Sequence, residues 1–139
     1  MASFNKFEQF IKDLGDKVHD LDADDIRVYL TNVAPSASAD SVIADLAEIS
    51  AGNGYDAGGK SATAVWTETS GTGKLTGTDI VWTASGGTIG AFRYAVLYNT
   101  TPTSPADPLI GWWDKGSSIT LQNGETFTVD FGTSLFTIS

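Results

Sequence analysis

The chain contains no cysteine, and this absence excludes both disulfide bonds and thiolate metal sites. Its stability must therefore come from packing or from assembly with other chains. Basic residues are also scarce, with 8 Lys and Arg against 17 Asp and Glu, which gives a formal charge of −9. Because binding to a phosphate backbone depends on many Lys and Arg side chains, nucleic acid is not an expected partner.

Long hydrophobic runs are missing as well. No apolar stretch approaches the ~20 residues that span a bilayer, so no membrane partner is expected. The opening residues "MASFNKFEQF" lack an apolar segment after a basic start, and they predict no signal peptide. We therefore expect a soluble protein that is made in the cytoplasm.

Catalytic side chains are few. His19 is the only histidine, so no Ser-His-Asp or Cys-His arrangement is expected, and we predict that its side chain is solvated. The carboxylates fall mostly at strand ends or at exposed alternate positions. The sequence therefore predicts a protein that is not an enzyme and that holds no cofactor and no metal.

The first 25 residues read as a helix followed by an acidic linker. Apolar residues recur every three or four positions from Phe4 to Val18, which predicts an amphipathic helix. Two alternatives stay open: the helix packs on its own domain, or it is an arm that docks on another chain. In the second case the candidate contact residues are Phe4, Phe7, Phe10, Ile11 and Leu14.

The linker has the alternating spacing of a calcium loop at Asp20, Asp22 and Asp24. However, Asp25 stands at the sixth position, where that loop needs Gly, and Thr31 at the twelfth, where it needs Glu. We therefore expect an acidic, solvated linker rather than a cation site.

Residues 26–139 are mainly β in pattern. The stretch 26–34 alternates as a half-buried strand, and residues 40–49 have the spacing of one further short helix. From Lys60 onward seven or eight strands, one of them at 74–84, are separated by turn residues. This pattern predicts an antiparallel β-sandwich or jelly-roll-like domain. The predicted core residues are Val28, Leu30, Val65, Ile80, Val96, Leu97, Phe127 and Val129.

Three details of this domain can be predicted further. The segment "AFRYAVLYN" is apolar on both faces, with Phe92, Tyr94, Val96 and Tyr98 on one of them, so it should be a central strand. The pair Asn123-Gly124 predicts a hairpin turn. Trp112 and Trp113 are neighbours and must face opposite sides of the sheet, so Trp113 is a candidate contact residue if its side is exposed.

The stretch "GYDAGGKS", residues 54–61, matches the phosphate-binding pattern G-x-x-x-x-G-K-[ST]. That loop must follow a strand and open a helix whose N–H groups point at the phosphates. Here the following residues, "ATAVWTET", alternate as a strand does. We therefore predict a glycine-rich turn and no nucleotide binding.

Several segments of the sequence resemble small virion structural proteins of tailed bacteriophages. They are "FNKFEQFIKDL", "EISAGNGYDAGG", "TASGGTIGAFRYAVLYN" and "PLIGWWDKGSSITLQNGETFTVDF", and the likeness extends from about Phe4 to Ile138. The resemblance implies a structural role in the virion, most simply as a head decoration or cement protein. It also implies a major capsid protein or another virion protein as partner, and a homo-oligomer, such as a trimer.

Two other functions fit the sequence. A tail or tail-tip component would present loops of the same domain to a bacterial surface. A carbohydrate-binding module or small glycosidase would instead present exposed Trp side chains such as Trp66, Trp82 or Trp113, with carboxylates between them.

Overall fold

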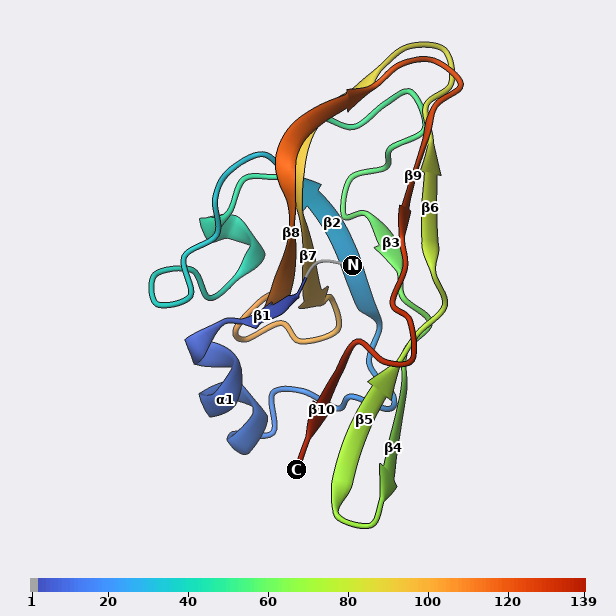
Figure 1. The fold of residues 1–139 in the computed structure, drawn as a ribbon. Helices are drawn as coiled ribbons and strands as arrows, with labels where there is room; N and C mark the ends of the chain where they lie inside the picture. The colour runs from blue at the N-terminus through green and yellow to red at the C-terminus, as the bar shows by residue number, and fades with distance from the viewer. Residues whose placement is uncertain (1–2) are drawn as a thin grey trace.

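The computed structural model describes residues 3–139, and this part of the chain is mainly β, with antiparallel sheets and one α-helix (Figure 1). The largest sheet has the strand order β1-β8-β7-β2-β3, formed by β1 (Phe4–Lys6), β2 (Ile26–Thr31), β3 (Lys60–Ser61), β7 (Ile89–Asn99) and β8 (Leu109–Leu121). A three-stranded sheet has the order β10-β5-β4 and a two-stranded sheet pairs β6 with β9; their strands are β4 (Val65–Thr69), β5 (Thr72–Thr76), β6 (Ile80–Thr83), β9 (Thr126–Val129) and β10 (Phe136–Ile138).

Strand β7 lies in the middle of the five-stranded sheet, as its two apolar faces predicted. Its residues do not all keep the predicted alternation, because the register with β8 shifts between Phe92 and Tyr94. The shift turns Phe92 to the same side as Ala95, away from Val96. The prediction that Phe92 shares a face with Tyr94 was therefore wrong, and an irregularity of this kind leaves no mark in a simple alternating pattern.

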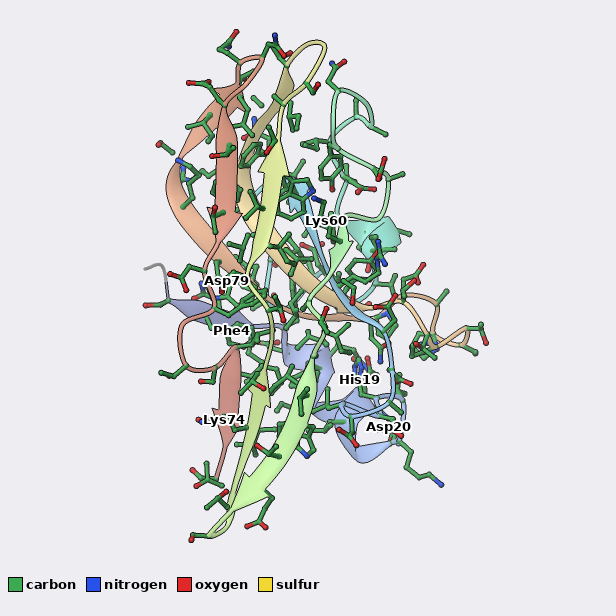
Figure 2. All side chains as sticks on the ribbon, turned by 90° about the vertical axis from the view of Figure 1, so that its right-hand side faces the viewer. Phe4, His19, Asp20, Lys60, Lys74 and Asp79 are labelled. Carbon is green, nitrogen blue, oxygen red and sulfur yellow. The ribbon has the colours of Figure 1, made fainter. Side chains whose placement is uncertain are left out.

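Apolar side chains cover both faces of this sheet. The larger core lies between one face and the two smaller sheets, and it contains Leu97 of β7, Leu75 of β5 and Trp82 of β6. Figure 2 shows side chains filling the space between the layers. The smaller core lies on the opposite face, where Leu46, from the segment between β2 and β3, packs with Tyr29, Val96 and their neighbours.

Six of the eight predicted core residues are buried: Val28, Leu30, Ile80, Val96, Leu97 and Val129. Phe127 is half-buried but packs against the larger core. The prediction for Val65 was wrong, because its side chain is 48% exposed. Val65 belongs to β4, an edge strand on which only Trp66 is partly covered.

The N-terminal helix is shorter than its pattern predicted. Helix α1 spans Glu8–Gly15, and the residues before it form strand β1 instead of a first helical turn. Phe4 pairs with Trp113 of β8, and its ring lies 5.3 Å from that of Trp113. The ladder satisfies the backbone of β1 while the Phe4 ring packs across it, so a tertiary contact overrides the helical spacing.

The second predicted helix is reduced to a single 3₁₀ turn, η1 (Ile43–Asp45). Its surroundings explain the difference, because the backbone makes hydrogen bonds to other segments of the chain rather than along a helix. The N–H of Ile43 donates to the backbone carbonyl oxygen of Asp107, and that of Ile49 donates to the backbone carbonyl oxygen of Leu30. These bonds hold the segment across the sheet with Leu46 beneath it.

Two other local predictions also need correction. The residues Asn123 and Gly124 do form a turn, but it is not a hairpin, because β8 and β9 belong to different sheets. The predicted strand at 74–84 is two strands, β5 and β6, separated at Gly77. A Cβ at Gly77 would lie 2.8 Å from the carbonyl oxygen of Ala62, so the chain crosses between sheets where only glycine fits.

Candidate functional site

The residues predicted as an interface on the helix do not form one exposed surface. Phe7 and Phe10 are buried in this chain, Phe7 in the smaller core and Phe10 in the larger one. Phe4 and Leu14 are half-buried against the larger core, whereas Ile11 is 54% exposed. The helix thus packs on its own chain, and Ile11 is the member of the set that offers most of its side chain to solvent.

Trp113 lies apart from that helix face, on the side of β8 that faces the larger core. Its neighbour Trp112 packs against the smaller core on the opposite side, as strand geometry predicted. The Trp113 ring contacts Phe4 at 5.3 Å and Phe131 at 5.7 Å. It remains half-buried because it also borders a hollow between β8, β7 and β9.

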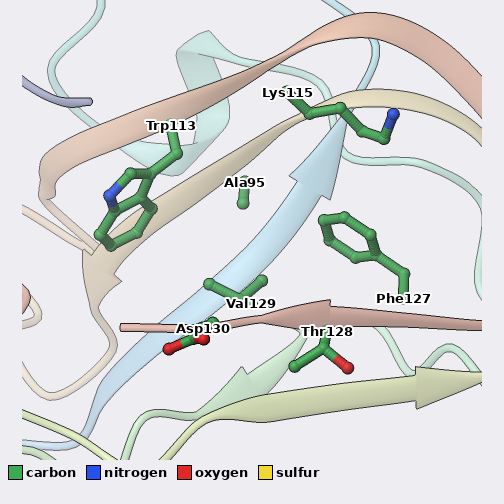
Figure 3. A pocket seen from close by; sticks show the side chains of 7 residues that line it. All are labelled: Ala95, Trp113, Lys115, Phe127, Thr128, Val129 and Asp130. Carbon is green, nitrogen blue, oxygen red and sulfur yellow. The ribbon is translucent and has the colours of Figure 1, made fainter. Parts of the chain in front are cut away.

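The hollow has a volume of about 320 Å³ and is lined by residues from three strands. Figure 3 shows Trp113 and Phe127 on opposite sides, with Ala95 and Val129 between them. The remaining lining residues, Lys115, Thr128 and Asp130, carry an ammonium, a hydroxyl and a carboxylate. We call this hollow, with its seven lining residues, the Trp113 pocket.

Its shape has a simple origin. Ala95 is a small residue on a central strand whose neighbours are large, so the sheet leaves room above it. Phe127 is held in place by Phe92, 4.9 Å away edge to face, and it stacks on Trp82 at 6.4 Å. The aromatic walls are therefore supported by core residues, which favours a preformed pocket.

The charged groups of the pocket are not paired with each other. Among residues 3–139, Lys115 takes part in no ion pair. Asp130 uses one carboxylate oxygen to accept the N–H of Gly132 at 2.8 Å. Thr128 and Asp130 alternate with Phe127 and Val129 along the chain, so their side chains point to the outer face of β9 and the walls of the hollow are mainly apolar (Figure 3).

The sequence indicated Trp113 but missed the rest of the pocket. Phe127 and Val129 were predicted to be core residues, and Asp130, which was predicted to lie at an exposed position, is exposed. The small Ala95 between large neighbours was the available signal, but pairing it with β9 required the packing of two separate sheets. Trp82, another residue considered for sugar contact, is fully buried.

His19 is also placed differently from the prediction. Its side chain is only 8% exposed, and it lies near helix α1 at an edge-to-face distance of 5.2 Å from Phe10 (Figure 2). The buried amide of Asn99 donates to His19 Nδ1 at 3.1 Å and to Asp24 Oδ2 at 2.8 Å. Burial lowers the pKa of the His19 imidazole, against the opposite pull of Asp13 and Asp24.

The acidic residues that follow form an ordered turn. Asp20 Oδ1 accepts the backbone N–H groups of Asp22 and Ala23, and Asp24 Oδ2 accepts the N–H of Asp20. These carboxylates are engaged in capping the backbone. Within residues 3–139 no three His, Asp or Glu side chains are grouped as metal ligands, and no helix is long and apolar enough to cross a membrane.

The phosphate-loop pattern lacks the local structure that nucleotide binding needs. Residues Lys60 and Ser61 form β3, so a strand stands where the motif requires a helix. Lys60 Nζ donates to the carbonyl of Val81 at 2.7 Å. Gly59 packs so closely on β2 that an added Cβ would lie 1.8 Å from the carbonyl oxygen of Val28. The glycines therefore serve a tight turn beside a strand.

Comparison of the chain with models of protein families, with curated proteins and with solved structures gave no match.

Proposed function

We propose that this protein is a structural component of a tailed-phage virion that binds the outer surface of the head as a decoration or cement protein. The observation that carries the proposal is the resemblance of its amino-acid sequence, from about Phe4 to Ile138, to small virion structural proteins. A protein of this kind needs a stable scaffold and a contact surface rather than a reaction centre.

We also infer that the scaffold is a β-sandwich. The support is the larger core, which joins one face of the five-stranded sheet to the β10-β5-β4 and β6-β9 sheets. Two packed layers of antiparallel strands that share one core are the usual basis of this architecture.

The proposed contact surface includes the open edges of the three-stranded sheet. Strands β4 and β10 each pair only with β5 among the described residues, so each has one free edge. Val65 on β4 is 48% exposed and Ile138 on β10 is 37% exposed. Unpaired edges with apolar side chains favour association with another chain.

These edges suit a homo-oligomer. If β4 of one subunit pairs with β10 of the next, the interface is head-to-tail, and such an interface closes into a ring when the rotation allows. A trimer is the smallest ring of this kind. Ile11, exposed on α1, adds a further apolar contact near the same end of the molecule (Figure 1).

The net charge of −9 is compatible with this position. The outer surface of a head faces solvent, whereas the phosphate backbone of the packaged DNA lies inside. An acidic protein on the outside avoids unfavourable contact with that backbone.

The test is binding of the purified full chain to phage heads that lack it, followed by imaging of the decorated particles. We expect saturable binding to heads, a regular array on the lattice, and a trimer by light scattering. The matched variants are Val65→Lys and Ile138→Lys, which place charge on the two edges, and Lys74→Met on the central strand β5 is the control.

The edge variants should weaken oligomer formation and head binding, and the control should behave as the native chain does. Binding to tails alone would replace the head assignment with the tail-tip alternative. Binding to neither structure would refute the proposed virion role.

A further inference from the structure

We propose that the free edge of β9, with the Trp113 pocket beside it, binds an extended segment of another protein as an added strand. The segment carries an apolar side chain and, two positions away, an acidic one. This contact uses none of the β4 and β10 edges and does not depend on binding to phage heads.

Strand β9 has one unpaired edge, because it pairs only with β6 within residues 3–139. In an antiparallel ladder, alternate residues bond to the partner strand and the others turn their N–H and C=O groups to the opposite edge. The N–H of Ala84 donates to the carbonyl oxygen of Glu125, and this pair continues the register of the ladder. Phe127, two positions on, therefore bonds to β6 as well, whereas Thr128 turns its N–H and C=O groups to the free edge.

The hollow lies beside this edge. Thr128 and Asp130 line it although their side chains point to the outer face of β9, so they reach it with backbone atoms (Figure 3). Strand β8 is also open at this point, because β1 pairs with it only as far as Trp113. A strand added to β9 would thus lie between the two layers and direct alternate side chains into the hollow.

The walls of the hollow suit one large apolar side chain. Trp113 and Phe127 lie on opposite sides of it, and its volume is about 320 Å³. Both rings are held by aromatic neighbours, Trp113 by Phe131 at 5.7 Å and Phe127 by Phe92 at 4.9 Å. A Leu or Phe side chain that enters this space leaves water and meets preformed apolar walls.

Lys115 selects the acidic position. It lies two residues after Trp113 on β8, and both line the same hollow. Its side chain is half-buried and takes part in no ion pair within the described part of the chain. Residues two apart on an added strand also share a face, so an apolar side chain beside Trp113 places the next inward side chain near Lys115. An Asp or Glu at that position would form a charge-assisted hydrogen bond.

The same features disfavour two other occupants. A small apolar molecule would fill the hollow but leave the N–H and C=O groups of Thr128 without partners. The edge strands of a second copy lack the required pattern, because no acidic residue lies two positions from Val65 of β4 or Ile138 of β10. An extended segment of a different protein can satisfy the backbone edge, the apolar walls and the ammonium together.

The test is an NMR titration of the ¹⁵N-labelled full chain with the acetylated, amidated peptide Thr-Thr-Leu-Thr-Glu-Thr-Thr. The indole N–H signal of Trp113 should shift saturably, with a dissociation constant below about 1 mM. At a peptide concentration of about ten times that constant, hydrogen exchange at the backbone N–H of Thr128 should slow by about tenfold, because this group is bonded only in the complex. The N–H of Val129, which already faces β6, is the internal reference.

Matched peptides and variants separate the two side-chain positions. The peptide with Ser in place of Leu should bind at least about tenfold more weakly, because it leaves the apolar walls uncovered. The peptide with Gln in place of Glu should bind about threefold more weakly or worse. Lys115→Met should abolish the difference between the Glu and Gln peptides, whereas the control Lys74→Met, on β5, should preserve it.

Two further variants test the edge and the volume. Thr128→Pro removes an N–H that does not bond to β6, so the ladder is kept and peptide binding should be lost. Ala95→Leu should fill the hollow and also prevent binding. If either variant does not fold, the exchange of the Thr128 N–H and the Lys115→Met comparison decide the matter.

The proposal is overturned if the Thr128 N–H exchanges equally fast in the free and peptide-bound chain, or if the Ser peptide binds as tightly as the Leu peptide. It is also overturned if octanoate shifts the Trp113 signal and the peptide does not, since the hollow would then be a site for a small molecule. A shift of that signal on dilution of the free chain would instead assign the hollow to a second copy.

Discussion

Replacing Phe10 by Ala tests whether the N-terminal helix is part of the core. The Phe10 side chain is 1% exposed and its ring lies 5.2 Å from His19 and 5.7 Å from Phe136. Truncating a fully buried Phe costs about 3–5 kcal/mol in unfolding free energy. Because a domain of this size is stable by about 5–15 kcal/mol, the variant should lose a large part of its stability.

The measurement is urea unfolding followed by tryptophan fluorescence, with the slope of the transition compared between variants. At about 4 °C per kcal/mol, the thermal midpoint should fall by about 12–20 °C. The matched control is Ile11→Ala, one position along the same helix. Ile11 is 54% exposed, so its truncation should change the unfolding free energy by less than about 0.5 kcal/mol.

The contrast between the two variants separates packing in cis from docking in trans. If the helix were a detached arm, both substitutions would leave the stability of the free chain almost unchanged and both would weaken head binding. A loss below about 1 kcal/mol for Phe10→Ala would therefore refute the packing described here.

Three more predictions follow from buried or strained positions. Burial lowers the pKa of His19 below its ordinary value of 6.5, so the unfolded chain binds the proton more tightly than the folded chain does. The free energy of unfolding should therefore fall as the pH drops through and below 6.5. His19→Gln should reduce this dependence of the unfolding free energy on pH. Gly59→Ala should cost at least about 3 kcal/mol in a urea titration, because its Cβ would meet the carbonyl of Val28 at 1.8 Å, whereas Gly124→Ala meets open space and should cost about 1–2 kcal/mol for its positive φ. Calorimetric titration with ATP and magnesium should give no saturable heat, because Lys60 lies on a strand and its ammonium already donates to a backbone carbonyl; submillimolar binding abolished by Lys60→Ala would contradict this.

The β character of the chain could be predicted because alternation survives in the sequence wherever one face of a strand is buried. This holds for Phe127 and Val129 on β9, and for the doubly buried half of β7. The same reasoning failed for Val65, because an edge strand can carry an apolar residue that no other element covers. Burial of that kind depends on strand order, which periodicity does not contain.

The prediction of a helix from Phe4 onward was wrong for a related reason. The spacing of Phe4, Phe7 and Phe10 fits a helix, but these three side chains reach different places. Phe4 lies in a ladder with β8, Phe7 in the smaller core and Phe10 in the larger core. A helical pattern fixes the angular spacing of side chains only if the backbone is helical throughout, and pairing with β8 replaced the first turn.

The cluster of buried polar side chains around His19 could not be predicted from the sequence. Its partner Asn99 lies 80 positions away, at the end of β7, and both are buried with Asp13. A lone His next to acidic residues resembles a solvated linker, and nothing local distinguishes the two cases. The Trp113 pocket is similar, because Trp113 and Phe127 are placed on its two sides by two sheets that share no hydrogen-bonded strand pair.

The open edges of β4 and β10 and the Trp113 pocket lie on different elements, so they can be tested separately. Pairing through β4 and β10 leaves the hollow between β8 and β9 free in every subunit. Val65→Lys and Ile138→Lys should therefore weaken oligomer formation while leaving the NMR signal of the Trp113 indole N–H unchanged in the ¹⁵N-labelled chain. A shift of that signal in either variant would show that the edges and the pocket are not independent.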